Sequence, residues 1–132
     1  MIHRGVLEFS TKEGISFIDI TKEVLSVIAK SRIREGTCNV FLPATTAGLL
    51  LNEKDRMLLE DFKKMFMLID ENKIYHHPSN AFSHLRASML RSDVTFPIAD
   101  GKAVLGTWQS IILWEFDVEP RKRSVVVTVT GE

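Results

Sequence analysis

The sequence has almost none of the features that mark secreted, membrane-spanning or polyanion-binding proteins. Its single cysteine, Cys38, cannot form an internal disulfide bond, and the start at Met1–Arg4 lacks the long apolar segment of a secretory signal. Apolar runs are only a few residues long, against the ~20 residues of a membrane-spanning helix. Seventeen Lys and Arg residues balance seventeen Asp and Glu residues, so no large positive field attracts nucleic acid or a lipid surface. These absences predict a cytoplasmic protein with no nucleic-acid or membrane partner.

What the sequence does contain is enough apolar material for one hydrophobic core. The chain has 132 residues, of which 45% are hydrophobic and 26% are charged, as in ordinary soluble globular proteins. That length corresponds to one domain and is too short for two ordinary cores. We therefore expect residues 1–132 to form a single domain.

The first elements are predicted from hydrophobic spacing. Apolar residues roughly alternate between residues 4 and 20 and are interrupted at Lys12–Gly14, which predicts a β-hairpin. The spacing then becomes helical, with Thr21 as the N-cap and Gly36 just past the end. Two short β-rich runs, 37–42 and 47–51, predict two further strands.

Two helices are predicted in the middle of the chain. The first is capped by Asn52 and runs to about Ile69. One broad apolar stripe follows it, formed by Leu58, Leu59, Phe62, Met65, Phe66 and Ile69. The second helix covers residues 79–90 and has an apolar face of Phe82, Leu85 and Met89.

The C-terminal third is predicted to be strand. Residues 94–98 alternate in polarity, and the Asp100-Gly101 pair is a strong signal for a tight turn. We expect 103–116 to form one long strand, bent at Gly106, and 123–130 to form the last strand. Consecutive strands joined by tight turns favour an α+β fold, a largely antiparallel β-sheet sandwich with two to three helices.

Histidines are the first candidates for chemistry. Three of the four histidines, His76, His77 and His84, lie within nine residues, two in a loop and one on the following helix. A loop ligand and a helix ligand can converge on one divalent ion. The alternative is a solvated Tyr-His-His loop and a surface helix histidine, since no cysteine or nearby carboxylate completes a ligand set.

Two further stretches are candidates for ligand binding. The loop that contains Thr45 and Thr46 offers hydroxyls and backbone N–H groups to a phosphate, although an ordinary tight connection has the same composition. Trp108 and Gln109 lie together inside the predicted long strand, where a tryptophan packs in the core more often than it stacks on a ligand.

Four segments occur together in a specific order: Ala44–Glu53, Asn80–Ser88, Gly106–Gln109 and Val129–Glu132. In this combination, over nearly the whole chain, the sequence resembles the YjbQ-type family, described as secondary thiamine-phosphate synthases. The resemblance implies a compact α+β domain assembled as a homotrimer, with a metal or an anion held among histidines near the subunit interface. It also implies a weak activity that couples an aminopyrimidine diphosphate to a thiazole phosphate and releases pyrophosphate.

The resemblance also implies roles for individual residues. Glu53 and His84 are the candidate catalytic residues, and His76, His77 and His84 are the candidate metal ligands, for zinc or magnesium. The loop between the histidines, which runs His77-Pro78-Ser79-Asn80, is shorter than in relatives, which usually have extra residues there including an acidic one. This departure leaves open which of His76 and His77 matches the family histidine. Candidate contacts to a small phosphorylated substrate are Thr45, Thr46, Asn52, Arg86, Trp108 and Gln109.

One departure from the family pattern creates an alternative function. Ala44 stands where family members usually have histidine, so two imidazoles are left and any divalent metal is expected to be weakly held. The alternative to an enzyme is therefore a homotrimeric anion or small-molecule binding protein that has lost catalysis.

Overall fold

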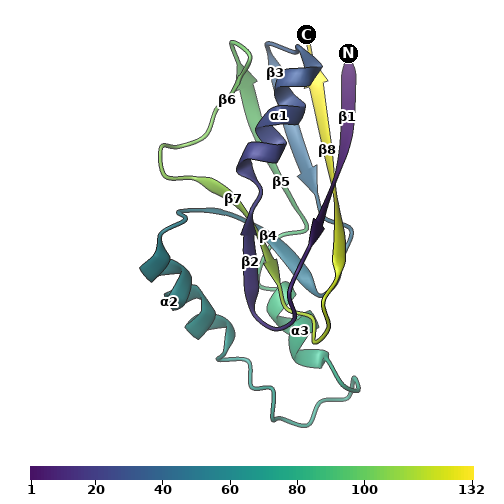
Figure 1. Cartoon of the computed structure of the whole chain (residues 1–132), viewed down its shortest axis with the longest axis vertical. Helices are drawn as coiled ribbons and strands as arrows, with labels where there is room; N and C mark the ends of the chain where they lie inside the picture. The colour runs from purple at the N-terminus through teal and green to yellow at the C-terminus, as the bar shows by residue number, and fades with distance from the viewer.

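The computed structural model describes all residues, Met1–Glu132, and contains eight strands and three helices (Figure 1). The helices are α1 Thr21–Ser31, α2 Arg56–Phe66 and α3 Ala81–Ala87. The strands are β1 Ile2–Ser10, β2 Ser16–Asp19, β3 Gly36–Phe41, β4 Ala47–Asn52, β5 Asp93–Ala99, β6 Lys102–Ala103, β7 Ser110–Glu115 and β8 Lys122–Gly131. None of the helices has the length and apolar character needed to cross a membrane.

The strands form two antiparallel sheets. Sheet A has five strands in the order β1-β8-β3-β5-β6, and sheet B has three in the order β2-β7-β4. Since β1 and β8 pair in opposite directions, the two chain termini lie side by side at one end of the molecule (Figure 1). The predicted α+β, largely antiparallel fold with three helices is confirmed.

Two hydrophobic clusters hold the layers together. The larger one joins the inner face of sheet A to α1 and to one face of sheet B, with Val24, Phe96 and Leu113 among its members. The smaller one joins the other face of sheet B to α2, through Phe66, Trp114 and their neighbours. Strand β7 is therefore buried on both faces, which explains its nearly continuous apolar run.

The first two strands form as predicted but do not pair as a hairpin. β1 pairs with β8, and β2 pairs with β7 in the other sheet. The connecting loop runs between the sheets, where the N–H of Gly14 donates to the carbonyl of Asp117 at 2.8 Å. The prediction of a hairpin was wrong because alternation shows which residues face a core but does not show which strand is the neighbour.

The helix boundaries also differ from the predictions. The N-cap of α1 is Ile20 and not Thr21, and the capping hydrogen bond is made by Asp19, whose carboxylate accepts the N–H of Thr21 at 3.0 Å. The N-cap of α2 is Asp55, whose carboxylate accepts the N–H of Leu58 at 2.9 Å, and not Asn52, which belongs to β4. Four residues of the predicted apolar stripe, Leu59, Phe62, Met65 and Phe66, belong to the cluster around Trp114, whereas α2 ends before Ile69.

The third helix is shorter than predicted and buries a different face. Its apolar residues Leu85 and Met89 are 42% and 45% exposed, whereas Ser83 and Arg86 are buried. The hydroxyl of Ser83 donates to the carbonyl of Phe116 at 2.5 Å, and this hydrogen bond attaches α3 to the end of sheet B. The prediction that the apolar face of this helix is its buried face was therefore wrong.

The predicted long strand over 103–116 is in fact two strands in different sheets. β6 ends at Ala103 and β7 begins at Ser110, and the loop between them leaves sheet A for sheet B. Within the loop, the side-chain oxygen of Gln109 accepts the N–H of Gly106 at 2.7 Å and closes a turn. Trp108 lies on this turn with 71% of its surface exposed, not inside a strand.

Candidate functional site

A cleft of about 570 Å³ lies at the end of sheet B where β4 begins and β7 ends. Three segments surround it: the β3–β4 loop, the start of α3, and the connection from β7 into β8. The lining residues are Pro43, Ala44, Thr45, Thr46, Asn80, His84, Asp117, Arg121, Lys122 and Arg123. The cleft thus brings three candidate site residues, Thr45, Thr46 and His84, together with charged residues that the sequence analysis did not identify.

A buried carboxylate holds one of the cationic side chains. Glu115 is fully buried, and its two oxygens accept Nε and Nη2 of Arg123 at 2.7 Å and 2.6 Å. The hydroxyl of Thr11 donates to the same carboxylate at 2.7 Å. This two-point contact fixes the plane of the guanidinium.

A second carboxylate, Asp117, holds Arg121 through a single contact. Asp117 accepts Nε of Arg121 at 2.6 Å and the hydroxyl of Thr46 at 3.2 Å. The hydroxyl oxygen of Thr46 in turn accepts Nη2 of Arg123 at 2.8 Å. Thr46 therefore links the two ion pairs into one network that forms the floor of the cleft.

The surroundings keep both carboxylates ionised. Burial raises the pKa of Glu115, but hydrogen bonds from Arg123, Thr11 and the backbone outweigh it, so the pKa lies below its ordinary value. Burial also raises the pKa of Asp117, and hydrogen bonds from Arg121 and the N–H of Val118 again bring the net pKa below the ordinary value. The two negative charges are thus available to fix the arginines at neutral pH.

The network leaves several donors directed at the cleft. Glu115 and Thr46 occupy Nε and Nη2 of Arg123, whereas its Nη1 makes no hydrogen bond within the chain. Lys122, between the two arginines in sequence, forms no ion pair. With the exposed hydroxyl of Thr45 close by, the cleft presents positive N–H and O–H donors on more than one side.

The histidines give an incomplete set of metal ligands. His84 lines the cleft, and the ring of His77 lies 4.8 Å from it, centroid to centroid. A proton on Nδ1 of His77 satisfies its 2.9 Å contact with the carbonyl of Pro78 and leaves Nε2 free. No group of three or more histidine, cysteine, aspartate or glutamate side chains converges within the chain, His76 included. Two imidazoles beside the methyl group of Ala44 fit a metal poorly, because protein zinc sites use three or four ligands.

Four predicted site residues lie at the opposite end of sheet B. Asn52 pairs with Ser110, whereas the cleft begins where Ala47 pairs with Glu115. Five residue steps along a strand separate the two ends by roughly 17 Å. Glu53, Trp108 and Gln109 accompany Asn52 at the far end, so a single chain does not bring them to the cleft.

Arg86 also lies outside the cleft. It is only 2% exposed, and its guanidinium donates to the carbonyls of Phe66 at 3.0 Å and Ile69 at 2.9 Å. A third contact, 3.2 Å to Glu71, completes the set, and Arg86 lines a separate hollow of about 400 Å³ next to α2. In the structure Arg86 therefore binds the carbonyls at the end of α2, away from the cleft that holds Thr45 and Thr46.

The family described as UPF0047 protein YjbQ-like matches residues 5–132. The chain belongs to the YjbQ-like UPF0047 family. A UPF0047 protein of Archaeoglobus fulgidus is 41% identical over 125 residues, which cover 92% of this chain and 96% of the relative. YjbQ of Escherichia coli O157:H7 is 31% identical over 139 residues, which cover both chains completely.

Solved structures of UPF0047 relatives share the whole fold. A YbjQ-like protein of unknown function from Sulfolobus solfataricus superimposes with a TM-score of 0.95 and 32% identity, covering 100% of this chain and 99% of its own. A YjbQ/UPF0047 protein from Clostridium acetobutylicum gives 0.85 and 36%, covering 94% and 99%. The two-sheet architecture is therefore the architecture of the family.

The charged residues of the cleft were missed by sequence reasoning. Residues 119–122 read as an ordinary charged turn, which is normally solvated. One signal was available: Glu115 and Asp117 interrupt the end of a continuous apolar run, and carboxylates in a buried run need partners. The partners, Arg121 and Arg123, follow within eight residues.

Proposed function

We propose that the cleft binds the phosphate groups of a small phosphorylated molecule. The observation that carries the proposal is the run Arg121-Lys122-Arg123, which lines one cleft together with Thr45 and Thr46. Guanidinium, ammonium and hydroxyl groups are the donors that phosphate oxygens accept most readily. The chain has no net charge, so this attraction comes from the local donors of the cleft.

The buried carboxylates make the cleft rigid. Glu115 and Asp117 each hold one arginine before any ligand arrives, so less side-chain freedom is lost on binding. They also neutralise those two arginines, which leaves Lys122 as the one cation of the run without an internal partner. A doubly charged phosphate group is then bound mainly through directed N–H donors and one free positive charge.

The same donors suit the reaction that the family resemblance implies. In that reaction the C–O bond between the aminopyrimidine methylene group and the diphosphate breaks, and the diphosphate leaves with the electron pair. The lone pair of the thiazole nitrogen then forms the new C–N bond. The main task of a protein is to neutralise the leaving group and to orient the two rings. We assign the first task to Arg121, Lys122 and Arg123, in place of Arg86.

A homotrimer supplies the groups that one chain keeps at the far end of sheet B. We propose that Trp108 and Gln109 of one copy, with Asn52 and Glu53, approach the cleft of the next copy. The exposed indole of Trp108 supports this arrangement, since a tryptophan that is 71% exposed is available to a neighbouring subunit. Light scattering in dilute solution should give three times the chain mass, and a monomer mass would contradict the assembly.

A binding protein without catalysis is the second candidate. The half-buried methyl group of Ala44 in the cleft wall favours it, because it leaves two imidazoles for zinc or magnesium, which would then be weakly held. Pyrophosphate release from an aminopyrimidine diphosphate and a thiazole phosphate separates the candidates: turnover favours the enzyme, and binding without turnover favours the binding protein.

Calorimetric titration with pyrophosphate, phosphate and thiamine phosphate tests the proposal. Lys122→Gln removes a cation with no internal partner, so we expect pyrophosphate affinity to fall roughly tenfold with the fold intact. Lys30→Gln, which removes an exposed cation from the last turn of α1, is the matched control and should leave affinity unchanged. Equal weakening by both variants, or no binding by the wild type, would overturn the proposal.

A further inference from the structure

A second hollow lies between α1 and the segment that starts with β6, at the end of β7 away from the cleft. Its volume is about 410 Å³, and most of its wall is apolar. Leu25, Ile28 and Ala29 line it from α1, and Ala103 and Leu105 line it from the opposite side. We call this hollow the α1 groove.

Two polar groups at the edge of the α1 groove, the Thr21 hydroxyl and the side-chain oxygen of Gln109, have partners within the chain. The hydroxyl of Thr21 donates to Asp19 at 2.6 Å and accepts the N–H of Ile111 at 2.8 Å. The side-chain oxygen of Gln109 accepts the N–H of Gly106. A ligand in the groove therefore meets a surface that favours hydrocarbon.

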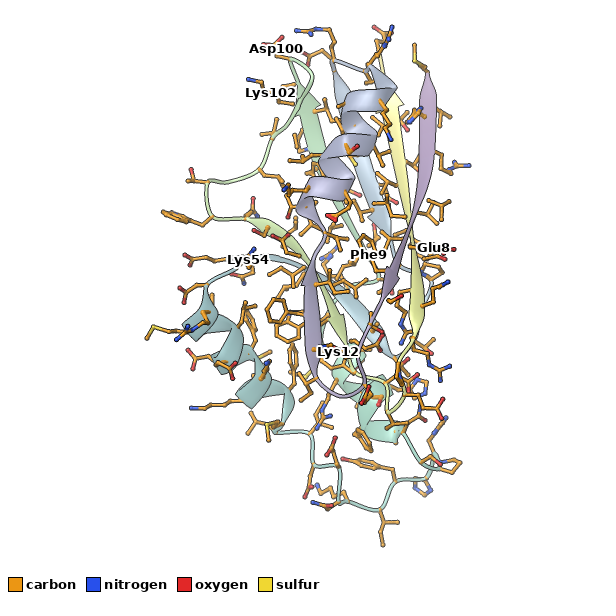
Figure 2. All side chains as sticks on the ribbon, in the orientation of Figure 1. Glu8, Phe9, Lys12, Lys54, Asp100 and Lys102 are labelled. Carbon is orange, nitrogen blue, oxygen red and sulfur yellow. The ribbon has the colours of Figure 1, made fainter.

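The charged residues that line the α1 groove and the hollow beside it are all positive. Lys102 is the only charged residue of its wall. A neighbouring hollow of about 380 Å³ shares Ile28 and Ala29 with the groove and adds Arg32 and Arg34 at the end of α1. Arg34 pairs with Asp100, whereas Lys102 and Arg32 form no ion pair. Figure 2 shows Asp100 and Lys102 together at the tip that follows β5.

We propose that the α1 groove binds a free fatty acid, whose hydrocarbon chain lies along α1 and whose carboxylate meets Lys102. The charge complementarity is specific: a mostly apolar wall that carries one unpaired cation, Lys102, matches an apolar chain that ends in one negative charge. From Thr21 to Arg32 the helix spans about 16 Å, enough to accommodate an extended chain of medium length.

Decanoate, below its critical micelle concentration, is the probe, and calorimetry on the full chain is the measurement. We expect saturable binding of one decanoate per chain, and weaker binding of shorter acids, by up to about fourfold per methylene group removed. Lys102→Gln should weaken decanoate about two- to fivefold and leave decanol unaffected. Lys22→Gln, a cation of α1 that does not line the groove, is the matched control and should have no effect.

Two variants test whether decanoate binds in the α1 groove. Ala29→Phe fills the groove from an exposed helix position, and Leu25→Asp places a negative charge in its wall, so each should abolish decanoate binding. Circular dichroism confirms that the variants fold, and either variant alone is sufficient. Failure of the wild type to bind, or binding that survives both variants, would overturn the proposal. A change of mass on Ala29→Phe in light scattering, without decanoate binding by the wild type, would show that a second copy of the chain covers the groove instead.

Discussion

Arg86 and Arg123 are the least exposed arginines of the chain, with side chains 2% and 12% exposed. They differ in which nitrogens of the guanidinium group are bonded within the chain. Backbone carbonyls at the end of α2 and Glu71 take up N–H groups on every guanidinium nitrogen of Arg86. Glu115 contacts one edge of Arg123, so that Nη1 remains available to the cleft. The partners of a buried arginine, more than its burial, separate a structural role from a binding role.

The largest effect is expected where a charge is removed from the cleft network. Glu115→Gln leaves the largely buried guanidinium of Arg123 with only Asp117, 4.0 Å from its Nη2, as a counter-charge, and breaking a buried pair costs about 3–5 kcal/mol of unfolding free energy. Chemical denaturation measures it. Glu119→Gln, an exposed carboxylate on the same connection, is the control and should stay within about 0.5 kcal/mol. Equal effects of the two variants would show that the network does not stabilise the fold.

Arg86→Met should have the second-largest effect on stability, a loss of about 2–3 kcal/mol of unfolding free energy, because it deprives the carbonyls of Phe66 and Ile69 of a charged donor. The important readout is pyrophosphate affinity, which we expect to be unchanged in this variant under conditions where it is folded. If Arg86→Met lowers pyrophosphate affinity without lowering stability, Arg86 has a binding role and not a structural one.

Arg121→Gln should weaken pyrophosphate binding by roughly tenfold, since one charge-assisted hydrogen bond is lost. Its side chain is 45% exposed, so a smaller effect on stability is expected than for Glu115→Gln. Titration calorimetry and denaturation of the same sample separate the two effects. If stability falls and affinity does not, Arg121 serves only to neutralise Asp117.

Some features of the fold could be predicted from the sequence, and others could not. The stripe of α2 was predictable because Leu59 and Phe66 pack on an apolar surface at helical spacing. The burial of Arg86 was not, because it depends on carbonyls of Phe66 and Ile69, and no spacing rule relates a residue to the end of the preceding helix. Likewise, the loop with Trp108 looked like strand because hydrophobic spacing does not detect a turn closed by Gln109.

The candidate site was half predictable for a related reason. Thr45, Thr46 and His84 were found from the composition of their segments and from the family motifs, and the structure brings them together. Glu115 and Arg123 were missed because a pair eight residues apart, across a turn, is visible only when the chain has folded into β7 and β8. Sequence reasoning identified some of the residues that line the cleft, and the folded structure was needed to identify the others, Asp117, Arg121, Lys122 and Arg123.

The acid dependence of stability should be concentrated in the cleft network. The pKa values of Glu115 and Asp117 lie below their ordinary values in the folded state, so both contribute stability above the unfolded pKa of about 4. That stability is lost as the pH falls through the lower folded pKa. Denaturation between about pH 5 and pH 2 should therefore show a shallower decline in Glu115→Gln than in the wild type. Parallel curves would locate the acid sensitivity elsewhere.

The smallest change in stability, less than about 1 kcal/mol, is expected for Ala44→His, because Ala44 is only half-buried and takes no part in the network. Its effect should lie in metal binding: a third imidazole beside His84 and His77 completes the usual minimum for zinc. Wild-type protein should lose zinc on extensive dialysis, and the variant should retain it, as measured by elemental analysis. Asn72→His, which places an imidazole in the hollow beside Arg86, is the matched control and should not retain zinc. One zinc held tightly by the wild type would mean that the cleft is completed by a ligand from another copy of the chain.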